Sequence, residues 1–217
     1  MDKFAPFTYQ DLVQLLETYN VDMTKWGTET FKTINDLFNE LNNDDCYMSI
    51  EHDKLVRYVS VVYILIVKGD YVLMEKEQTL CAGRKRIRNL PLAEKIIPPE
   101  SLDNAIVRGI HEELLYIGNP YDIASVHQSA FEVKINNLAD EDNIKCTEEI
   151  MESKSYPNLL CKYKKYVVEC EVNTLPSSEF TSFEIRNDKY LITNWHWVKI
   201  NDAINLNEMI KLYYQKP

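Results

Sequence analysis

The chain has 217 residues, 45% of them hydrophobic, and a formal net charge of -10, which predict one ordinary domain with a real core plus an extension. The negative charge counts against nonspecific nucleic-acid binding, because polyanions are repelled at long range. No apolar run reaches the about 18 residues of a membrane span, and the N-terminus lacks the basic-then-apolar order of a signal peptide. A soluble intracellular protein with no membrane partner is therefore expected.

Five cysteines are spread along the chain, and no two of them form a Cys-x-x-Cys pair. An odd number without this spacing fits neither a disulfide framework nor a zinc ribbon. The thiols are therefore expected to be reduced and mostly buried. This predicts the cytoplasm or another reducing intracellular compartment.

Residues 1–50 predict a helical extension that precedes a second domain over residues 51–217. Thr8 and Asp11 form a capping pair ahead of a first apolar face, and a second apolar stripe covers residues 28–41. Two interpretations of the extension remain open. It is a subdomain that docks a protein partner or covers a substrate, or it is a packed extension that hides a sheet edge or a helix surface.

A β-hairpin is predicted after the extension. Residues 55–68 are dense in β-branched side chains, which favours a long, buried strand. Gly69-Asp70 predicts a tight turn, and residues 71–78 return as a second strand.

Five cations gather in residues 83–95 of an otherwise acidic chain; they are Arg84, Lys85, Arg86, Arg88 and Lys95. On a strand, Arg84, Arg86 and Arg88 alternate onto one side and form a positive row that can bind the phosphates of a substrate. The alternative is a solvated, charged edge strand that resists aggregation.

Residues 100–114 predict a loop that runs into a helix. Pro98-Pro99 cannot continue a preceding element, and Ser101 can cap the first free N–H groups. Gly118 followed by Pro120 ends the helix. Apolar residues at helical spacing form one buried stripe, namely Leu102, Ala105, Ile106, Ile110 and Leu114.

Adjacent carboxylates lie on this helix. The residues predicted on one side of it are Gly109, Glu112, Glu113 and Tyr116. Arg108, one turn before Glu112, can hold that carboxylate in an i,i+4 ion pair. Two adjacent acids that face one way are costly without a cation, and magnesium takes carboxylate oxygens while keeping waters and substrate phosphates as its other ligands. The helix therefore has the chemistry of a diphosphate-cleaving site.

The segment resembles a degenerate Nudix box, whose pattern is Gly, five residues, Glu, seven residues, then Arg-Glu-aliphatic-x-Glu-Glu-x-Gly-aliphatic. The residues at matching positions are Glu100, Arg108, Ile110, Glu112 and Glu113, with Tyr116 a loose match. Three residues depart from the pattern: Glu94 at the first Gly, Gly109 at the Glu after the arginine, and Leu115 at the closing Gly. The resemblance is specific over residues 91–118 and follows the order of elements over residues 55–197.

The resemblance implies an α/β fold, a Nudix-type α/β/α sandwich with a mixed sheet behind the helical extension. It implies a Mg²⁺ or Mn²⁺ cofactor held by Glu112 and Glu113, with Arg108 orienting them and Glu100 assisting at the helix mouth. In the Nudix family the glutamate that Gly109 replaces is commonly a metal ligand and sometimes the general base.

Polar residues 136–155 predict a mobile loop, with a short helical turn opening at Thr147. Nudix hydrolases often recruit an acid from outside the box, which would complete the metal shell that Gly109 leaves short. The candidates are Glu94, Glu148, Glu149 and Glu152. The alternative is that these are plain surface acids.

The C-terminal third predicts further strands and a closing helix. The expected segments are strands in 121–133, 161–172 and 190–198, a turn-like stretch at 180–188, and an amphipathic helix at 200–214. Trp195, His196 and Trp197 on the final strand either stack on a nucleobase or, like most aromatics of a terminal strand, belong to the core.

Two hypotheses from different classes follow. The first is a Nudix-type, divalent-metal-dependent hydrolase of a diphosphate linkage in a nucleotide, a nucleotide conjugate or an RNA 5′ end. The second is a catalytically degenerate nucleotide- or RNA-binding or scaffold protein of the same fold, which keeps the pocket and joins an assembly through its helical extension. In both, the expected ligand is a small phosphorylated molecule or an RNA end.

Overall fold

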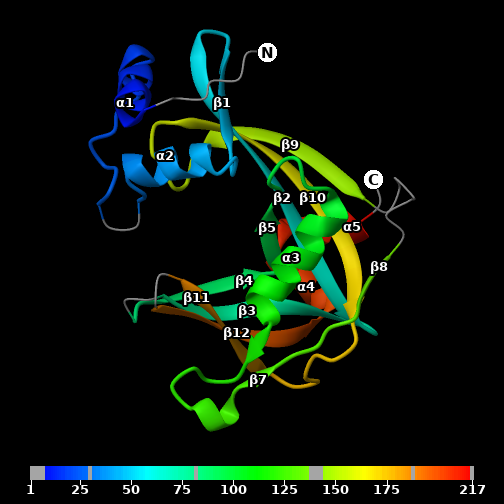
Figure 1. Cartoon of the computed structure of the whole chain (residues 1–217). Coiled ribbons are helices and arrows are strands. Elements are labelled where there is room, and N and C mark those ends of the chain that lie inside the picture. The colour runs from blue at the N-terminus through cyan, green and yellow to red at the C-terminus, as the bar shows by residue number, and fades with distance from the viewer. Residues whose placement is uncertain (1–7, 29–30, 81–82, 137–143, 187–188, 216–217) are drawn as a thin grey trace. The chain divides into compact units, whose positions relative to one another are not determined.

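A computed structural model describes residues 8–28, 31–80, 83–136, 144–186 and 189–215 (Figure 1). The chain forms two compact units. The first contains Met1–Val61, Lys95–Ser101 and Cys146–Lys165, and the second contains Val62–Glu94, Leu102–Lys145 and Tyr166–Pro217. The predicted domain division at residue 50 stays a prediction.

The first unit has two helices, and each begins at a capping box. The helices are α1 (Tyr9–Thr18) and α2 (Ile34–Asn42). Thr8 Oγ1 accepts from the Asp11 N–H at 3.1 Å, and the Asp11 carboxylate accepts from the Thr8 N–H at 2.9 Å, so the predicted cap is confirmed. Thr33 and Asp36 repeat this arrangement at α2, which therefore begins later than the predicted residue 28.

These helices pack on strands of the same unit. Its strands are β1 (Tyr47–Glu51), the first parts of β2 (Lys54–Lys68) and β10 (Leu160–Val172), and all of β9 (Lys145–Glu152) except its first residue. Leu12 and Leu16 of α1 and Leu37 of α2 are fully buried in one hydrophobic cluster with Met48 of β1 and Cys161 of β10. The helices therefore supply part of the core of this unit, which supports the interpretation of a packed extension.

A buried ion cluster lies in the first unit. Glu40 and Arg57 are only 6% and 4% exposed, and their side chains lie 2.5 Å apart. Lys32 and Lys95 also contact Glu40, at 2.5 and 3.3 Å. Burial by itself raises the pKa of Glu40, but attraction to Arg57, Lys95 and Lys32 outweighs burial and lowers this pKa from 4.5 to about 2. The cluster therefore stabilises the fold only while Glu40 is ionised.

Glu40→Gln is expected to destabilise the protein by about 3 kcal/mol at pH 7, because it leaves Arg57 buried without its charged partner. The folded pKa of Glu40 is lowered, so its contribution is complete above pH 4.5 and is lost as the pH falls to about 2. The difference between variant and wild type should shrink over that pH window in urea unfolding followed by circular dichroism. Glu148→Gln, which removes a half-exposed partner of Lys162, is the control and should change stability by less than about 1 kcal/mol. Equal effects of the two variants would contradict the structural role of Glu40.

The second unit is built on a sheet centred on β12 (Lys189–Lys199). This strand pairs antiparallel with β3 (Tyr71–Thr79) and with β11 (Phe180–Arg186). The other elements of this unit are β4 (Lys85–Leu90), β5 (Leu92–Lys95) except its last residue, α3 (Leu102–Leu114), β6 (Tyr116–Ile117), the 3-10 helix Ile123–Ser125, β7 (His127–Gln128), β8 (Val133–Ile135), α4 (Ile200–Leu206) and α5 (Glu208–Tyr214). Hydrogen-bonded neighbours follow the order β7, β6, β11, β12, β3 and β2, with β4 beside β3.

The predicted hairpin is confirmed at the start of this sheet. Val67 of β2 pairs with Val72 of β3, and Lys68 pairs with Tyr71. Only two residues, Gly69 and Asp70, remain between the paired ends, which is the length of a tight turn.

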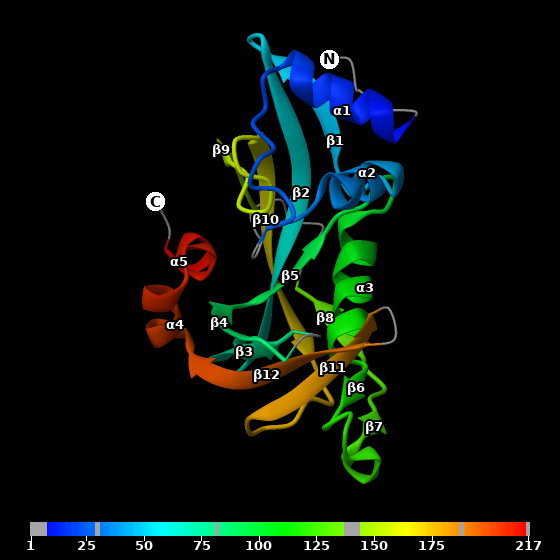
Figure 2. The ribbon, with the colours of Figure 1, turned by 90° about the vertical axis from the view of Figure 1, so that its left-hand side faces the viewer.

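Helices cover both faces of the second unit's sheet (Figure 2). Leu65 of β2 belongs to a buried cluster that includes Ala203 of α4 and Ile210 of α5. Its neighbour Ile64 instead reaches Gly109 of α3, with Cδ1 3.5 Å from the place where a Cβ on Gly109 would stand. Successive side chains of a strand point to opposite faces, so α3 lies on one face and α4 with α5 on the other. The predicted α/β/α sandwich with a mixed sheet and flanking helices is confirmed.

Several segments differ from their predicted structure. Residues 145–152, expected in a mobile loop with a helical turn, form β9, and residues 180–186, expected to be turn-like, form β11. The closing helix is divided, because Asn207 caps α5 by accepting from the Met209 N–H at 2.9 Å. Both strands depend on pairing with distant residues, which local composition does not reveal. Residues 137–143 of the expected loop lie outside the described residues.

Candidate functional site

Helix α3 carries the candidate site, and its buried stripe fixes how it lies on the sheet. The fully buried stripe residues are Ala105, Ile106, Ile110 and Leu114. Burying one large aliphatic side chain contributes about 1.5–3 kcal/mol, so the stripe holds the helix against rotation. The helix ends at Leu114, and Tyr116 belongs to strand β6. The prediction that Tyr116 shares a helical side with the acids is therefore wrong, because the chain leaves the helix one residue earlier.

Arg108 is the centre of the charged group on α3. Its Nη1 lies 3.3 Å from Glu112 Oε1, which confirms the predicted i,i+4 ion pair, and 3.2 Å from Glu94 Oε1 on β5. The carboxylates of a strand and of a helix therefore meet at one guanidinium. Glu94, one of the four acids considered for the space beside Gly109, belongs to the same unit as this helix and contacts its Arg108.

Gly109 makes this approach possible. A Cβ built on Gly109 would lie 2.8 Å from Glu94 Cβ and 3.0 Å from Glu94 Cγ. Both distances are shorter than ordinary carbon contacts, so the side chain of Glu94 lies directly against the backbone of α3. The Glu94 side chain is 16% exposed. The sequence contained a signal for this contact. Glu94 stands where the Nudix pattern has its first glycine, and Gly109 stands where that pattern has a glutamate.

The two adjacent acids of α3 have different surroundings. Glu113 is 9% exposed, whereas the side chain of Glu112 is 48% exposed. Neighbouring residues of a helix point about 100° apart, which turns one acid towards the protein and leaves the other at the surface. The two acids predicted to share one side of the helix therefore differ in exposure, and their joint binding of a cation stays a prediction.

The other acidic candidates lie in the first unit and have partners there. Glu148 contacts Lys162 at 3.5 Å, Glu149 forms an ion pair with Lys165, and Glu152 accepts from the Asn158 N–H at 2.9 Å. Attraction to Lys165 and its hydrogen bond lower the pKa of Glu149. Glu100 also belongs to the first unit, where its carboxylate accepts from the Ile97 N–H at 2.6 Å and closes a turn.

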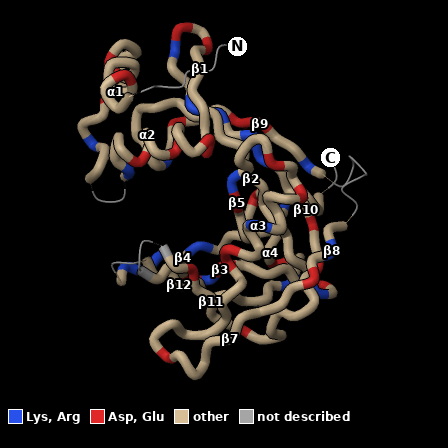
Figure 3. The backbone as a smooth tube through the Cα atoms, viewed as in Figure 1, with Lys and Arg blue, Asp and Glu red and all other residues tan. Residues whose placement is uncertain are grey.

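Of the three arginines predicted to form a basic row, Arg86 and Arg88 lie on β4, where Lys and Arg positions are blue in Figure 3. Arg86 and Arg88 of β4 extend to the same side, as expected from strand alternation. Arg86 Nε donates to Gln78 at 2.9 Å, and Arg88 Nε donates to Glu75 at 2.9 Å. Glu75 is 1% exposed, so Arg88 compensates a buried carboxylate. Arg84 precedes the strand and is exposed.

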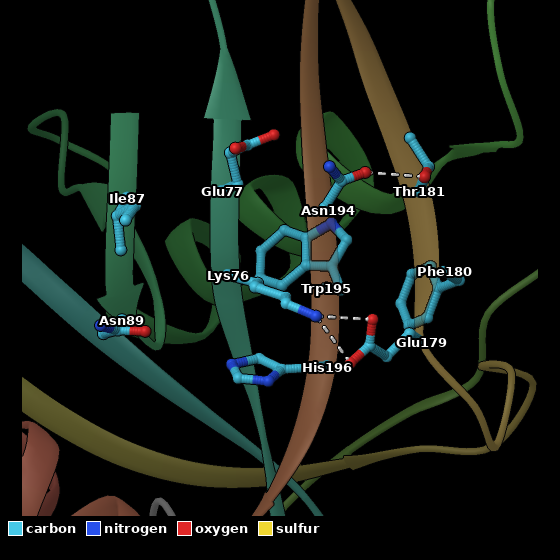
Figure 4. A pocket seen from close by; sticks show the side chains of 10 residues that line it. All are labelled: Lys76, Glu77, Ile87, Asn89, Glu179, Phe180, Thr181, Asn194, Trp195 and His196. Atoms are coloured by element: carbon cyan, nitrogen blue, oxygen red, sulfur yellow. Dashed lines mark hydrogen bonds and ion pairs between the residues drawn. The ribbon is translucent and has the colours of Figure 1, made fainter. Parts of the chain in front are cut away.

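A cavity of about 530 Å³ opens on the sheet near β12 (Figure 4). Its lining residues are Lys76, Glu77, Ile87, Asn89, Glu179, Phe180, Thr181, Asn194, Trp195 and His196. His196 pairs with Met74, which belongs to the cluster under α4 and α5, so the cavity lies on the face opposite α3. Lys76 Nζ lies 2.9 Å from both Glu179 oxygens.

The aromatic residues of β12 are largely structural. Trp195 is fully buried and donates Nε1 to Ser182 Oγ at 2.7 Å. Trp197 donates Nε1 to the Pro176 carbonyl at 2.8 Å. Burial lowers the pKa of His196, more than attraction to Glu179 raises it. The core interpretation of these aromatics is therefore confirmed for Trp195, whose indole also forms part of the cavity wall.

No protein-family model and no curated protein sequence matches the chain. Similar solved structures include a NUDIX hydrolase from Nitrosomonas europaea, with 14% identity over 70% of this chain and 78% of that chain, and a TM-score of 0.38. A MutT protein from Bacillus halodurans shares 12% identity over 72% and 80%, with a TM-score of 0.35. A NUDIX-family hydrolase from Clostridium perfringens shares 15% over 70% and 96%, with a TM-score of 0.34.

The chain is thus similar in structure to Nudix hydrolases. One fold hosts many functions, so the function of this chain depends on the chemistry of the residues on and around α3.

The acids of α3 can be tested for their fit to a divalent cation. No group of three Asp, Glu, His or Cys side chains in the described ranges is arranged as a metal site. Mg²⁺, however, is usually bound by one or two carboxylates together with waters and substrate phosphates. Glu94 and Glu112 supply two carboxylates at one place, because glycine at 109 leaves room for the first. This donor set fits a cation that is bound jointly with a phosphorylated ligand.

Arg88→Ala is expected to destabilise the protein by about 3 kcal/mol, because it leaves the buried carboxyl group of Glu75 without its partner. Adding Glu75→Leu should recover most of that loss, since a buried ion pair replaced by apolar groups is commonly neutral. Arg84→Ala is the matched control on the exposed side of the same segment and should leave stability unchanged. Urea unfolding of the four proteins measures this. Arg88→Ala with wild-type stability would show that Arg88 is available for a ligand after all.

Proposed function

We propose that this chain is a divalent-cation-dependent hydrolase of the Nudix type, which cleaves a diphosphate linkage in a nucleotide, a nucleotide conjugate or an RNA 5′ end. The observation that carries the proposal is the meeting of two carboxylates from separate elements. Glu94 of β5 and Glu112 of α3 both lie within 3.3 Å of Arg108 Nη1. Carboxylates gathered in this way bind Mg²⁺ or Mn²⁺ together with phosphate oxygens.

The residues of the site have different tasks under this proposal. Glu112 and Glu94 hold the cation, and the more buried Glu113 is a further ligand. Arg108 keeps the two carboxylates oriented before the cation arrives, and its guanidinium then donates to a phosphate oxygen. The cation, when bound, neutralises phosphate charge and supplies an activated water. Glu100 acts indirectly, by closing the turn that precedes α3.

The rest of the ligand is recognised by residues of the sheet. Arg84 and Arg86 are the better candidates for phosphate contacts, because Arg88 is committed to the buried Glu75. The cavity beside His196 lies on the face of the sheet opposite α3 and therefore takes no part in binding this ligand.

The second candidate function is a binding protein of the same fold that does not turn over its ligand. The observation that favours it is the pair of ion contacts that Arg108 makes with Glu94 and Glu112. Any cation must compete with Arg108 for the carboxylate of Glu112, and position 109 carries no acid. Loss of a general base costs about 10² to 10⁴ in rate, which is enough to leave binding without useful catalysis.

Glu112→Gln separates the two functions. Wild type is incubated with nucleoside diphosphate conjugates, dinucleoside polyphosphates and triphosphate-ended RNA, with Mg²⁺ or Mn²⁺ and with a chelator as blank. Hydrolysis resolved by chromatography is expected, and Glu112→Gln should lower kcat/KM by about 10²-fold, because it removes a cation ligand at nearly constant volume. Glu208→Gln, an exposed acid on α5 of the same unit, is the matched control and should retain full activity.

Binding of the same compounds is measured by calorimetry in parallel. Saturable binding with no product, in wild type and at every cation tested, would replace the hydrolase by the binding protein. Neither binding nor product would reject both functions.

A further inference from the structure

The contact between Glu94 and Gly109 is sterically exclusive. A Cβ at position 109 would stand 2.8 Å from Glu94 Cβ and 3.0 Å from Glu94 Cγ. These atoms lie near the backbone of β5, so rotating the far end of the side chain does not relieve the overlap. A side chain at position 109 and a glutamate side chain at position 94 cannot both occupy their present places.

The backbone conformation of Gly109 does not explain the choice of glycine. Gly109 lies in the interior of α3 and does not have the positive φ that favours glycine elsewhere in the chain. Glycine within a helix costs about 0.5–1 kcal/mol relative to alanine. The compensating gain is space, and Glu94 is the side chain that fills it.

The carboxylate of Glu94 lies beside the surface of α3 that carries Arg108 and Glu112. A helix brings residue 109 near residue 112 on one surface, since residues three apart are neighbours. An acid at 109 would therefore emerge close to Glu112. Glu94 brings its own carboxylate to the same place from β5, because Arg108 Nη1 contacts Glu94 at 3.2 Å and Glu112 at 3.3 Å.

We propose that Glu94 and Gly109 are an exchanged pair: the carboxylate on β5 serves in place of an acid at position 109, and glycine at 109 is required to admit it. The steric half of this inference stands on the contact alone. The role of Glu94 in holding a cation beside Glu112 rests on the proposed function.

The reciprocal exchange tests the steric half. Glu94→Gly, Gly109→Glu and the double variant are compared with wild type by thermal unfolding. Gly109→Glu alone should lower Tm by about 5 °C or more, because it overpacks the contact. The double variant should recover most of that loss, since the two side chains have exchanged places. If Gly109→Glu does not fold, Gly109→Ala and its double variant with Glu94→Gly give the same comparison. Additive Tm changes would overturn the pairing.

Cation binding tests the role of the carboxylate. Mn²⁺ titration by calorimetry, without substrate, is expected to show at least about 10-fold weaker binding for Glu94→Gln, a variant that keeps the volume of the side chain. The Glu94→Gly and Gly109→Glu double variant should return to within about 3-fold of wild type. Glu208→Gln, an exposed acid on α5, is the control and should bind Mn²⁺ as wild type does.

The outcomes separate this inference from the hydrolase proposal. Mn²⁺ affinities that follow the expected order, in a protein that hydrolyses none of the compounds, support the exchanged pair and reject the enzyme. Hydrolysis and Mn²⁺ binding that are both indifferent to Glu94→Gln support the enzyme and overturn the inference. A wild type without measurable Mn²⁺ binding overturns the role given to Glu94.

Discussion

The structure of the candidate site depends on one guanidinium. Arg108 Nη1 lies 3.2 Å from Glu94 and 3.3 Å from Glu112, so it joins a strand to a helix through charge. Partly buried carboxylates are costly without a compensating charge, and the space for one of them exists only because residue 109 has no side chain. Packing and electrostatics therefore constrain the same few residues.

The same principle recurs in other parts of the described structure. Glu75 is buried under Arg88 in the second unit, and Glu40 is buried beside Arg57 in the first. In each case a carboxylate with little exposure is matched by an arginine from another element. Such pairs contribute modestly to net stability but are costly to break, so they select one arrangement of strands and helices among alternatives with similar hydrophobic burial.

The arrangement also affects how a cation and a phosphorylated ligand would bind under the proposed function. Before a cation and a phosphorylated ligand bind, Arg108 satisfies the carboxylates that they would need. A phosphorylated ligand can compensate for the loss of the ion pair, because an arginine released from a carboxylate binds phosphate oxygens with comparable geometry. A phosphorylated ligand is therefore expected to strengthen the binding of the cation, whether the protein turns its ligand over or only holds it. The cavity beside His196 lies on the face of the sheet opposite α3, so its residues and those of the α3 site do not meet around one ligand.

Features that depend on local geometry could be predicted from the amino-acid sequence. The capping box of Thr8, the hairpin at Gly69-Asp70 and the ion pair from Arg108 to Glu112 follow from residues at most five positions apart, whose relation is set by helix or turn geometry. Only the tertiary structure decided that Glu94 lies against Gly109, that Arg88 compensates Glu75, and that residues 145–152 form a strand. These contacts depend on how separate strands and helices pack, and neither the spacing of residues nor their intrinsic preferences encodes that packing.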